Sequence, residues 1–360
     1  MMKKNKNTID RKLIKQFPKV DLHCHLDGSL RIETILELAQ KNGIELPTTD
    51  PEQLKKEVAV SNDRINLSDY IDKFEIPLSV LQTYSALRRA AYELAEDASR
   101  ENVLYLEVRY SPILHTEKNL QPKETTNAVL EGLEQAEDDF NIQTGVIITG
   151  LRNMSPDVSY QLAKVALAYK NHGVVGFDLA GVEEDFPAKH HREAFYLILD
   201  NNINTTIHAG EDYGPESIHQ ALHYCGAHRI GHGVRLEENK DLMNYVNDHR
   251  IPLEMCLTSN IHTGAVEDLN QHPFKYYFDC GLRVTLNTDN RLISNTTMTE
   301  EYLLAKTAFG FDIKDYKRLI LNSFKSAFLP YQTKSHIIQE VSREMDDYID
   351  RFNNSNFQES

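Results

Sequence analysis

Eight short apolar runs, rich in β-branched residues, recur along the chain, and each ends in small or polar residues. They are KVDLHCH (19–25), VLYLEVRYSP (103–112), TGVIITGLR (144–152), VVGFDLAG (174–181), NTTIHAGE (204–211), HRIGHG (228–233), PLEMCLTSN (252–260) and RVTLNTDN (283–290). Helix-like segments such as 159–171 separate most of them. The later runs recur every 24 to 33 residues or so, which suits one crossover helix plus one parallel strand. Eight such units predict an α/β fold of the (β/α)8 TIM-barrel type.

The competing architecture is an open doubly wound sheet, but no G-x-G-x-x-G follows the first run. Extra helices are expected after the first strand, at about 30–100, and at the C-terminus, at about 314–352, where they would cover the outside of the barrel. In the first insertion, NLSDYIDKF places four apolar residues on one helical face, namely Leu67, Tyr70, Ile71 and Phe74. This face serves either core packing or an apolar lid over the barrel mouth. Because no linker interrupts the chain, we expect a single domain over 1–360.

Charge and cysteine content restrict the class of partner and the compartment. Asp and Glu number 54 against 39 Lys and Arg, a formal net charge of −15, which argues against nucleic acid as the main partner. Four scattered cysteines do not form a disulfide framework, so a reducing compartment is expected. The basic N-terminus has no apolar signal region, and no stretch approaches the ~20 apolar residues of a membrane helix. We therefore expect a cytoplasmic protein without membrane contact, whereas the sequence does not indicate its oligomeric state.

Ionisable residues stand where several predicted strands end. His23 and His25 share one face of the first strand, since alternate strand residues point the same way. His208 ends the fifth strand, and His232 and Asp289 end the sixth and the eighth. A barrel gathers its catalytic groups at the carboxyl ends of its strands. Three of these four histidines together with the carboxylate of Asp289 would make a site for zinc, with room for one water.

Two acidic residues near these motifs have more than one interpretation. Glu211 is either a desolvated general acid or a first-turn acid of a helix beginning near Pro215. Asp27 is either the N-cap of a helix beginning near Ser29 or a ligand contact. Five other histidines are expected to be solvated or capping groups, namely His190, His191, His219, His223 and His249. His115-Thr-Glu117 and His191-Arg-Glu193 match half of the cytidine-deaminase signature, but neither is followed by P-C-x-x-C.

Taken in order, these motifs resemble the adenosine deaminases of the metal-dependent amidohydrolase superfamily. The resemblance runs from about Pro18 to about Tyr302 and rests on KVDLHCHLDGSL, LEVRYSP, VGFDLAG, HAGE, HRIGHG and LNTDN. It implies a barrel with one Zn²⁺ per subunit that hydrolyses adenosine to inosine and ammonia in purine salvage. 2'-Deoxyadenosine is implied as a second substrate.

The resemblance also implies a role for individual residues. It assigns the zinc ligands to His23, His25, His208 and Asp289, the proton donor to purine N1 to Glu211, and the water-orienting histidine to His232. It assigns substrate contacts to His25 and Asp27 near the ribose and to the Gly181 backbone N–H near purine N3. His232 would either take a proton from the attacking water or stabilise the resulting charge, and the sequence leaves both roles open. Asp289 would also aim the attacking water.

One position departs from many relatives, which carry a second Asp where this chain has Asn290 after Asp289. An amide can donate a hydrogen bond to purine N7 at any pH, so the change is compatible with purine binding. Adenine and AMP deaminases share much of this framework, but the DLAG context of Gly181 and the acidic net charge favour a nucleoside. A dinuclear amidohydrolase is disfavoured because the fourth strand lacks lysine. A binding protein without catalysis is disfavoured because every expected site position is filled.

Overall fold

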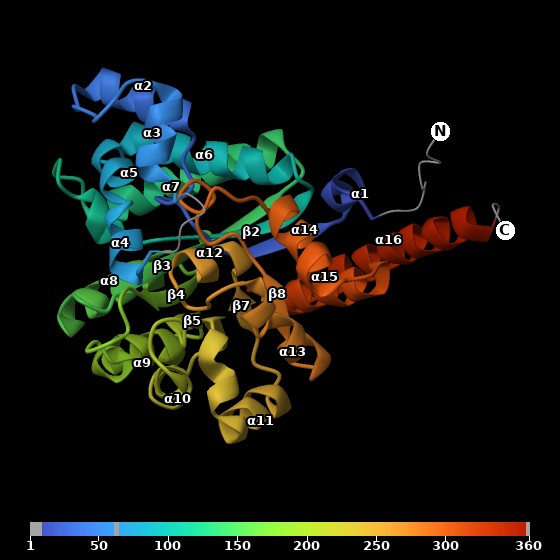
Figure 1. Ribbon diagram of the computed structural model, residues 1–360. Coiled ribbons are helices and arrows are strands. Elements are labelled where there is room, and N and C mark those ends of the chain that lie inside the picture. Colours follow the sequence, from blue (N-terminus) through green and yellow to red (C-terminus); the bar gives the residue numbers. More distant parts are fainter. Residues whose placement is uncertain (1–8, 61–64, 358–360) are drawn as a thin grey trace.

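The structure of the protein is a computed structural model that describes residues 9–60 and 65–357. Eight strands form one sheet in the order of the chain, and each pairs in parallel with the next. They are β1 (Lys19–His25), β2 (Val103–Tyr110), β3 (Gln143–Leu151), β4 (Val174–Ala180), β5 (Asn204–Ala209), β6 (Arg229–His232), β7 (Leu253–Met255) and β8 (Val284–Leu286). A parallel bridge between Cys24 and Asp289 joins the segment after β8 to β1. The sheet is thus a nearly closed barrel (Figure 1), and the predicted fold class is confirmed.

Helices surround this barrel and connect its strands (Figure 1). The crossover helices are α6 (Tyr84–Ser99), α7 (Pro122–Asp139), α8 (Pro156–Ala168), α9 (Arg192–Asp200), α10 (Pro215–His223), α11 (Lys240–Asp248) and α13 (Phe274–Asp279). Short 3-10 helices lie at η1 (Pro112–His115), η2 (Ala188–His191), η3 (Val234–Glu238) and η4 (Leu269–Gln271). The helix predicted over 159–171 is α8, which begins three residues earlier because proline is well suited to the first helical position.

The described part of the insertion after β1 contains four helices before α6. They are α2 (Ile32–Asn42), α3 (Pro51–Val58), α4 (Leu67–Asp72) and α5 (Glu75–Val80), drawn in blue and cyan on one side of Figure 1. The part of the predicted insertion at 61–64 lies outside the described residues. The N-cap of α2 is Arg31, so the prediction that Asp27 caps a helix near Ser29 is wrong. This leaves the carboxyl of Asp27 for another role.

The seventh predicted run, 252–260, is only partly a strand. β7 ends at Met255, and the polar half of the run forms α12 (Leu257–His262). The carboxylate of Glu301, in α14 (Met298–Phe309), accepts the backbone N–H of Leu257 at 2.9 Å and that of Thr258 at 3.4 Å. A buried acid from another helix therefore satisfies the first turn of α12, and this contact is not visible in the local sequence.

Helices near the two ends of the chain lie together on one side of the barrel. They are α1 (Arg11–Gln16), α15 (Ile313–Ser326) and α16 (Tyr331–Phe357), and α16 extends away from the barrel in Figure 1. Phe17 links them, since its ring lies 5.5 Å from that of Tyr316 and 5.4 Å from that of Tyr348. Helices are thus present at the predicted C-terminal position. Across residues 9–60 and 65–357, no helix is long and apolar enough to cross a membrane.

Candidate active site

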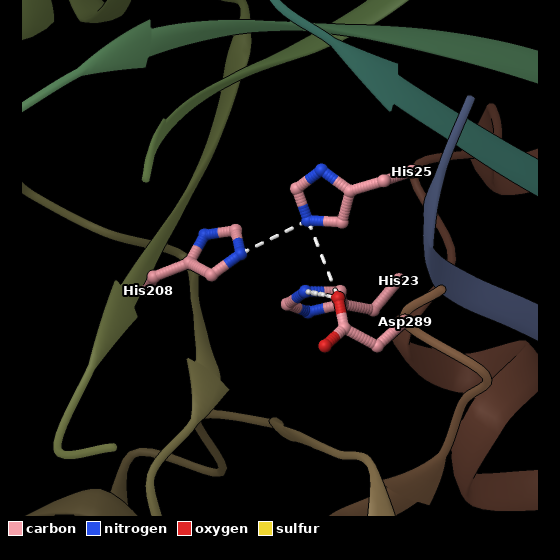
Figure 2. Close-up of side chains that lie close together, drawn as sticks. All are labelled: His23, His25, His208 and Asp289. Carbon is pink, nitrogen blue, oxygen red and sulfur yellow. Dashed lines mark hydrogen bonds and ion pairs between the residues drawn. The ribbon is translucent and has the colours of Figure 1, made fainter. Parts of the chain in front are cut away.

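Four side chains meet at the carboxyl-end rim of the barrel (Figure 2). His23 and His25 come from β1, His208 from β5, and Asp289 follows β8. Their ligand atoms all lie within 4.8 Å of one another. The Asp289 Oδ1 atom is 3.4 Å from Nε2 of both His23 and His25, and Nε2 of His25 is 3.2 Å from Nε2 of His208. The predicted ligand positions are therefore brought together in space.

Buried carboxylates orient two of these imidazoles. His23 Nδ1 lies 3.0 Å from Glu254 Oε2, and His208 Nδ1 lies 3.1 Å from Asp178 Oδ1. Each carboxylate accepts the Nδ1–H proton, so the lone pair of Nε2 faces the centre of the cluster. The Nε2 atom of His23 is buried and has no hydrogen-bond partner.

The aspartate completes a donor set that fits a metal ion. Ser259 Oγ donates to Asp289 Oδ2 at 2.5 Å, which leaves Oδ1 toward the histidines. Three imidazole nitrogens and one carboxylate oxygen are ligands that zinc accepts. The orphaned Nε2 of His23 supports the same conclusion, because an unpaired buried nitrogen lone pair is costly without a partner.

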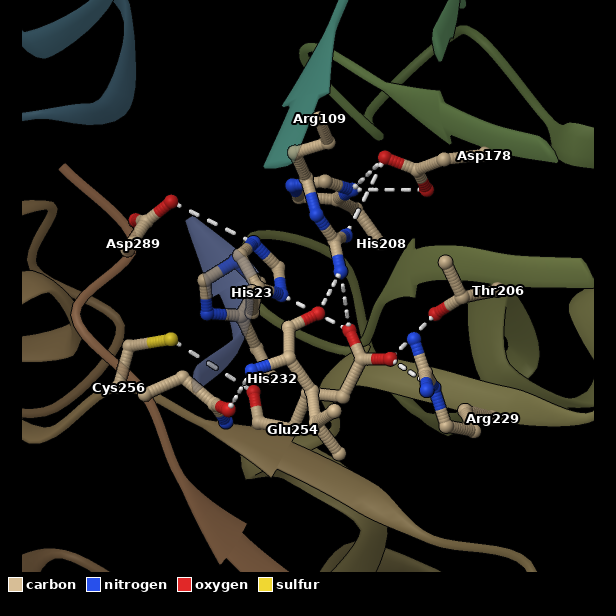
Figure 3. Close-up of polar contacts among 12 residues, drawn as sticks. His23, Arg109, Asp178, Thr206, His208, Arg229, His232, Glu254, Cys256 and Asp289 are labelled. Atoms are coloured by element: carbon tan, nitrogen blue, oxygen red, sulfur yellow. Dashed lines mark hydrogen bonds and ion pairs between the residues drawn. The ribbon is translucent and has the colours of Figure 1, made fainter. Parts of the chain in front are cut away.

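A second polar layer lies beneath the cluster, inside the barrel (Figure 3). Arg109 donates to Glu254 at 2.8 Å and to Asp178 at 3.3 Å. Arg229 and Thr206 also donate to Glu254, at 2.5 Å and 2.9 Å. Burial raises the pKa of Glu254, but the charges of Arg229 and Arg109 outweigh it and hold this pKa well below its usual range. Sequence reasoning missed this layer, although charged residues inside apolar strands were a visible signal.

Glu211 lies in the turn after β5 and not in a helix. The cap of α10 is Gly214, so the interpretation of Glu211 as a first-turn acid of that helix is wrong. Its Oε1 accepts a hydrogen bond of 2.9 Å from Thr263, and its Oε2 is 3.4 Å from His232 Nε2. Burial, reinforced by the charges of Asp289 and Glu183, raises the pKa of Glu211 well above its usual range. This carboxyl can therefore keep a proton beside the metal site.

Glu183 holds the backbone of the turn that carries Glu211. Its carboxylate accepts the N–H groups of Gly210, Glu211 and Asp212 at 2.9, 2.8 and 3.2 Å. The side chain is buried. Sequence reasoning missed this residue, and its only signal was an acidic pair shortly after the fourth strand.

His232 and Asp289 both have left-handed backbones, with φ of 61° and 59°. This conformation is uncommon for residues other than glycine, and such residues cluster at functional sites. The His232 ring lies 4.7 Å from that of His23, so the two are direct neighbours at the rim.

The predicted substrate-contacting residues line one cavity above the cluster, of about 380 Å³. Its walls include His25, Asp27, Gly181 and Asn290, and also the four residues of the apolar face, Leu67, Tyr70, Ile71 and Phe74. That face therefore borders the cavity, as the lid interpretation requires. Among the described residues that line the cavity, none is lysine or arginine.

Asp27 and Asn290, both in the walls of this cavity, each have a buried side-chain oxygen without a hydrogen-bond partner. Asp27 is 3% exposed, its Oδ1 atom has no hydrogen-bond partner, and burial raises its pKa to about 7. Asn290 donates from Nδ2 to the Tyr70 hydroxyl at 3.0 Å, while its Oδ1 is buried and unpaired. Gly28 permits this placement, because a Cβ there would lie 1.8 Å from Oδ1 of Asn290. One N–H of the Asn290 amide, the group predicted to donate to purine N7, is thus donated to the Tyr70 hydroxyl of the apolar face.

One of the histidines expected to be solvated or capping is instead part of the interior. His191 is 2% exposed, and its ring lies 2.8 Å from Ser159 Oγ and 3.2 Å from the carbonyl oxygen of Arg152. It joins η2 to α8 and to the turn that follows β3, so the expectation for His191 is wrong. His190, His223 and His249 are exposed, as expected.

This barrel and this metal site define a TIM-barrel amidohydrolase. A family model described as adenosine deaminase matches residues 18–344. The chain therefore belongs to the adenosine deaminase family, which confirms the family and the class of enzyme predicted from the motifs.

Individual relatives agree with this assignment. The chain is 40% identical over 324 residues to an adenosine deaminase of Clostridium acetobutylicum, which covers 90% of this chain and 97% of that one. It is 42% identical over 339 residues to a probable adenosine deaminase of Dictyostelium discoideum, covering 94% of this chain but 44% of that longer protein. The crystal structure of an adenine deaminase from Arthrobacter aurescens matches with a TM-score of 0.86 at 27% identity, covering 91% and 99% of the two chains.

Proposed function

We propose that this chain uses one zinc ion to hydrolyse adenosine, and 2'-deoxyadenosine, to inosine or deoxyinosine and ammonia. The observation that carries this proposal is the position of Glu211, a carboxyl whose pKa burial raises well above its usual range, next to the His23, His25, His208 and Asp289 cluster. A metal site that activates water and a neighbouring carboxyl that protonates the ring together suit hydrolysis at an amidine carbon.

When bound by these four residues, zinc supplies a Lewis acid that lowers the pKa of water to about 7. Water oxygen bonds to C6, and one of the two protons of this water replaces the proton that Glu211 gives to N1. The other proton passes to the amino group, which leaves as ammonia when the C6–N6 bond breaks. Attack at C6 moves negative charge onto N1, and Glu211 donates a proton there as that charge develops. Thr263 occupies Oε1 of Glu211, which leaves Oε2 to face the substrate.

The cavity favours a nucleoside over a nucleotide. Its described walls contain no lysine or arginine that could pair with a phosphate, and the net charge of −15 acts in the same direction. Asp27 and His25, which line the cavity, would contact the ribose, and Gly181 would donate its backbone N–H to N3. Nδ2 of Asn290 has two N–H groups, so one would donate to purine N7 while the other stays paired with the Tyr70 hydroxyl.

Ultraviolet absorbance of the zinc-loaded protein with adenosine, adenine and AMP in parallel tests this proposal. We expect rapid loss of adenosine absorbance alone, abolished by a chelator. Glu211→Gln should keep its zinc but lose about 100-fold or more in turnover, the usual contribution of a general acid. Turnover of adenine or AMP instead of adenosine contradicts the substrate, and substantial activity of Glu211→Gln contradicts the acid role.

A further inference from the structure

A line of three buried side chains leads away from the active site at His232, and none of the proposed roles explains it. Asn260, in α12, contacts His232, and His272, just before α13, contacts Asn260. The side chains of His232, Asn260 and His272 are 1%, 0% and 4% exposed. His232 is the member of this line that is nearest to the metal site, where it lies beside His23 (Figure 3).

The direction of these hydrogen bonds follows from one backbone group. The N–H of Phe274 points at Nδ1 of His272, 3.1 Å away. A backbone N–H can only donate, so Nδ1 must be the acceptor. Burial lowers the pKa of His272 to about 3, so its ring is neutral and carries its one proton on Nε2. That Nε2–H group donates to Oδ1 of Asn260 at 3.2 Å.

The orientation of the Asn260 amide determines which nitrogen of His232 accepts a hydrogen bond. With Oδ1 occupied by His272, its Nδ2 group faces Nδ1 of His232 at 2.9 Å. An amide NH₂ can only donate, so Nδ1 of His232 accepts and the proton of the neutral ring is on Nε2. Rotating the amide by 180° would place its NH₂ against the Nε2–H of His272, two donors facing each other. The line therefore has one consistent direction.

We infer that Asn260 and His272 are positioning residues that fix the tautomer of His232, so that its Nε2 donates a hydrogen bond into the active site. A neutral His232 in this tautomer has no lone pair at Nε2 and cannot take a proton from the attacking water there. Its role is to stabilise negative charge on the oxygen that attacks C6. This role rests on the proposed function, whereas the tautomer is a property of the free protein.

The first test measures the tautomer directly. Two-bond ¹H–¹⁵N correlation spectra of the ¹⁵N-histidine-labelled full chain, with and without zinc, distinguish protonated from unprotonated ring nitrogens. His232 and His272 are assigned from the signals lost in His232→Gln and His272→Gln. We expect Nε2 of both rings to be protonated in the wild type. A proton on Nδ1 of His232 overturns the inference, whether or not the protein turns over adenosine.

Matched variants test the individual hydrogen bonds of this line. Asn260→Asp replaces the donor to His232 by a group that only accepts, so the proton of His232 should move to Nδ1. His272→Gln keeps a donor near the position of Nε2, whereas His272→Asn keeps only an acceptor near the position of Nδ1. The two substitutions thus separate the contact with Asn260 from the contact with Phe274.

The kinetic expectations differ between these variants. Asn260→Asp should lower kcat by about 100-fold with little change in KM, as the loss of a donor in the transition state does. His272→Asn should lower kcat by about tenfold, and His272→Gln should restore most of it. Equal losses in the two His272 variants, or a wild-type His232 spectrum in Asn260→Asp, overturn the inference. Wild type with the expected tautomer but no adenosine turnover instead contradicts the proposed function alone.

Discussion

Thr263 donates a hydrogen bond of 2.9 Å to Oε1 of Glu211, and this contact makes the two carboxyl oxygens inequivalent. Thr263 directly follows α12, and its side chain is buried. The bond lowers the pKa of Glu211, in opposition to the larger effect of burial. Thr263 therefore both aims the acid and keeps it from becoming too weak.

Thr263→Val should lower kcat about fivefold, the equivalent of one hydrogen bond of about 1 kcal/mol, with zinc content unchanged. Valine has nearly the shape of threonine but has no hydroxyl. Thr263→Ser keeps the donor and serves as the control, with kcat close to wild type. Steady-state kinetics with metal analysis checks both variants, and a wild-type kcat in Thr263→Val would contradict the aiming role.

Glu183→Gln should loosen the turn that carries Glu211. The carboxylate of Glu183 accepts three backbone N–H groups, and a glutamine would direct its own NH₂ toward at least one of them. We expect a loss of about 1–3 kcal/mol in the free energy of unfolding and a lower kcat. The neighbouring Glu184 is exposed, so Glu184→Gln is a matched control that should change neither quantity. Denaturant unfolding and kinetics measure both, and equal behaviour of the two variants would refute the anchoring role.

The sequence predicts much of the metal site because the rules involved are local. Side chains alternate along a strand, so His23 and His25 share a face, and parallel strands end at one rim, so His208 and Asp289 join them. The orienting groups are not predictable in this way. Glu254 meets His23 across the barrel, 231 residues away in sequence, and nothing near either residue indicates that pairing.

Two of the sequence predictions that proved wrong concern the residue at which a helix begins. The start of α12 depends on Glu301, which lies 44 residues beyond Leu257 in the chain. Asp27 resembled a helix cap because an acid before a polar segment is typical of one, yet α2 begins only at Ile32. At α12 a tertiary contact decided what local propensity left open.

Acid should weaken the fold through the buried pair of Glu101 and Arg291. Burial raises the pKa of Glu101, but the charge of Arg291 and its hydrogen bond, with the N–H of Thr299, bring it down to about 2, from 4.5. Because the folded-state pKa is depressed, the stabilisation is complete above about pH 4.5 and is lost as the pH falls toward 2. A shift of this size corresponds to at most about 3 kcal/mol.

Glu101→Gln should therefore be less stable than wild type at pH 7, and the difference should shrink on going from pH 5 to pH 3. Urea unfolding across this range measures it. Glu45→Gln, at an exposed position, is the control and should follow the wild-type pH profile. A difference between Glu101→Gln and wild type that stays constant with pH would contradict the ion-pair explanation.

Metal binding should stabilise the fold independently of catalysis. Without an ion, three imidazoles and a carboxylate share a small buried space, and Nε2 of His23 has no hydrogen-bond partner. An ion that binds only the folded chain adds stability that grows with its free concentration. We expect the Tm of the chelator-treated protein to rise on titration with zinc, and this rise to vanish in His208→Asn. His249→Asn, at an exposed histidine, should respond as wild type does. Thermal unfolding monitored by circular dichroism measures the response, and an equal rise in wild type and His208→Asn would place the stabilising metal elsewhere on the chain.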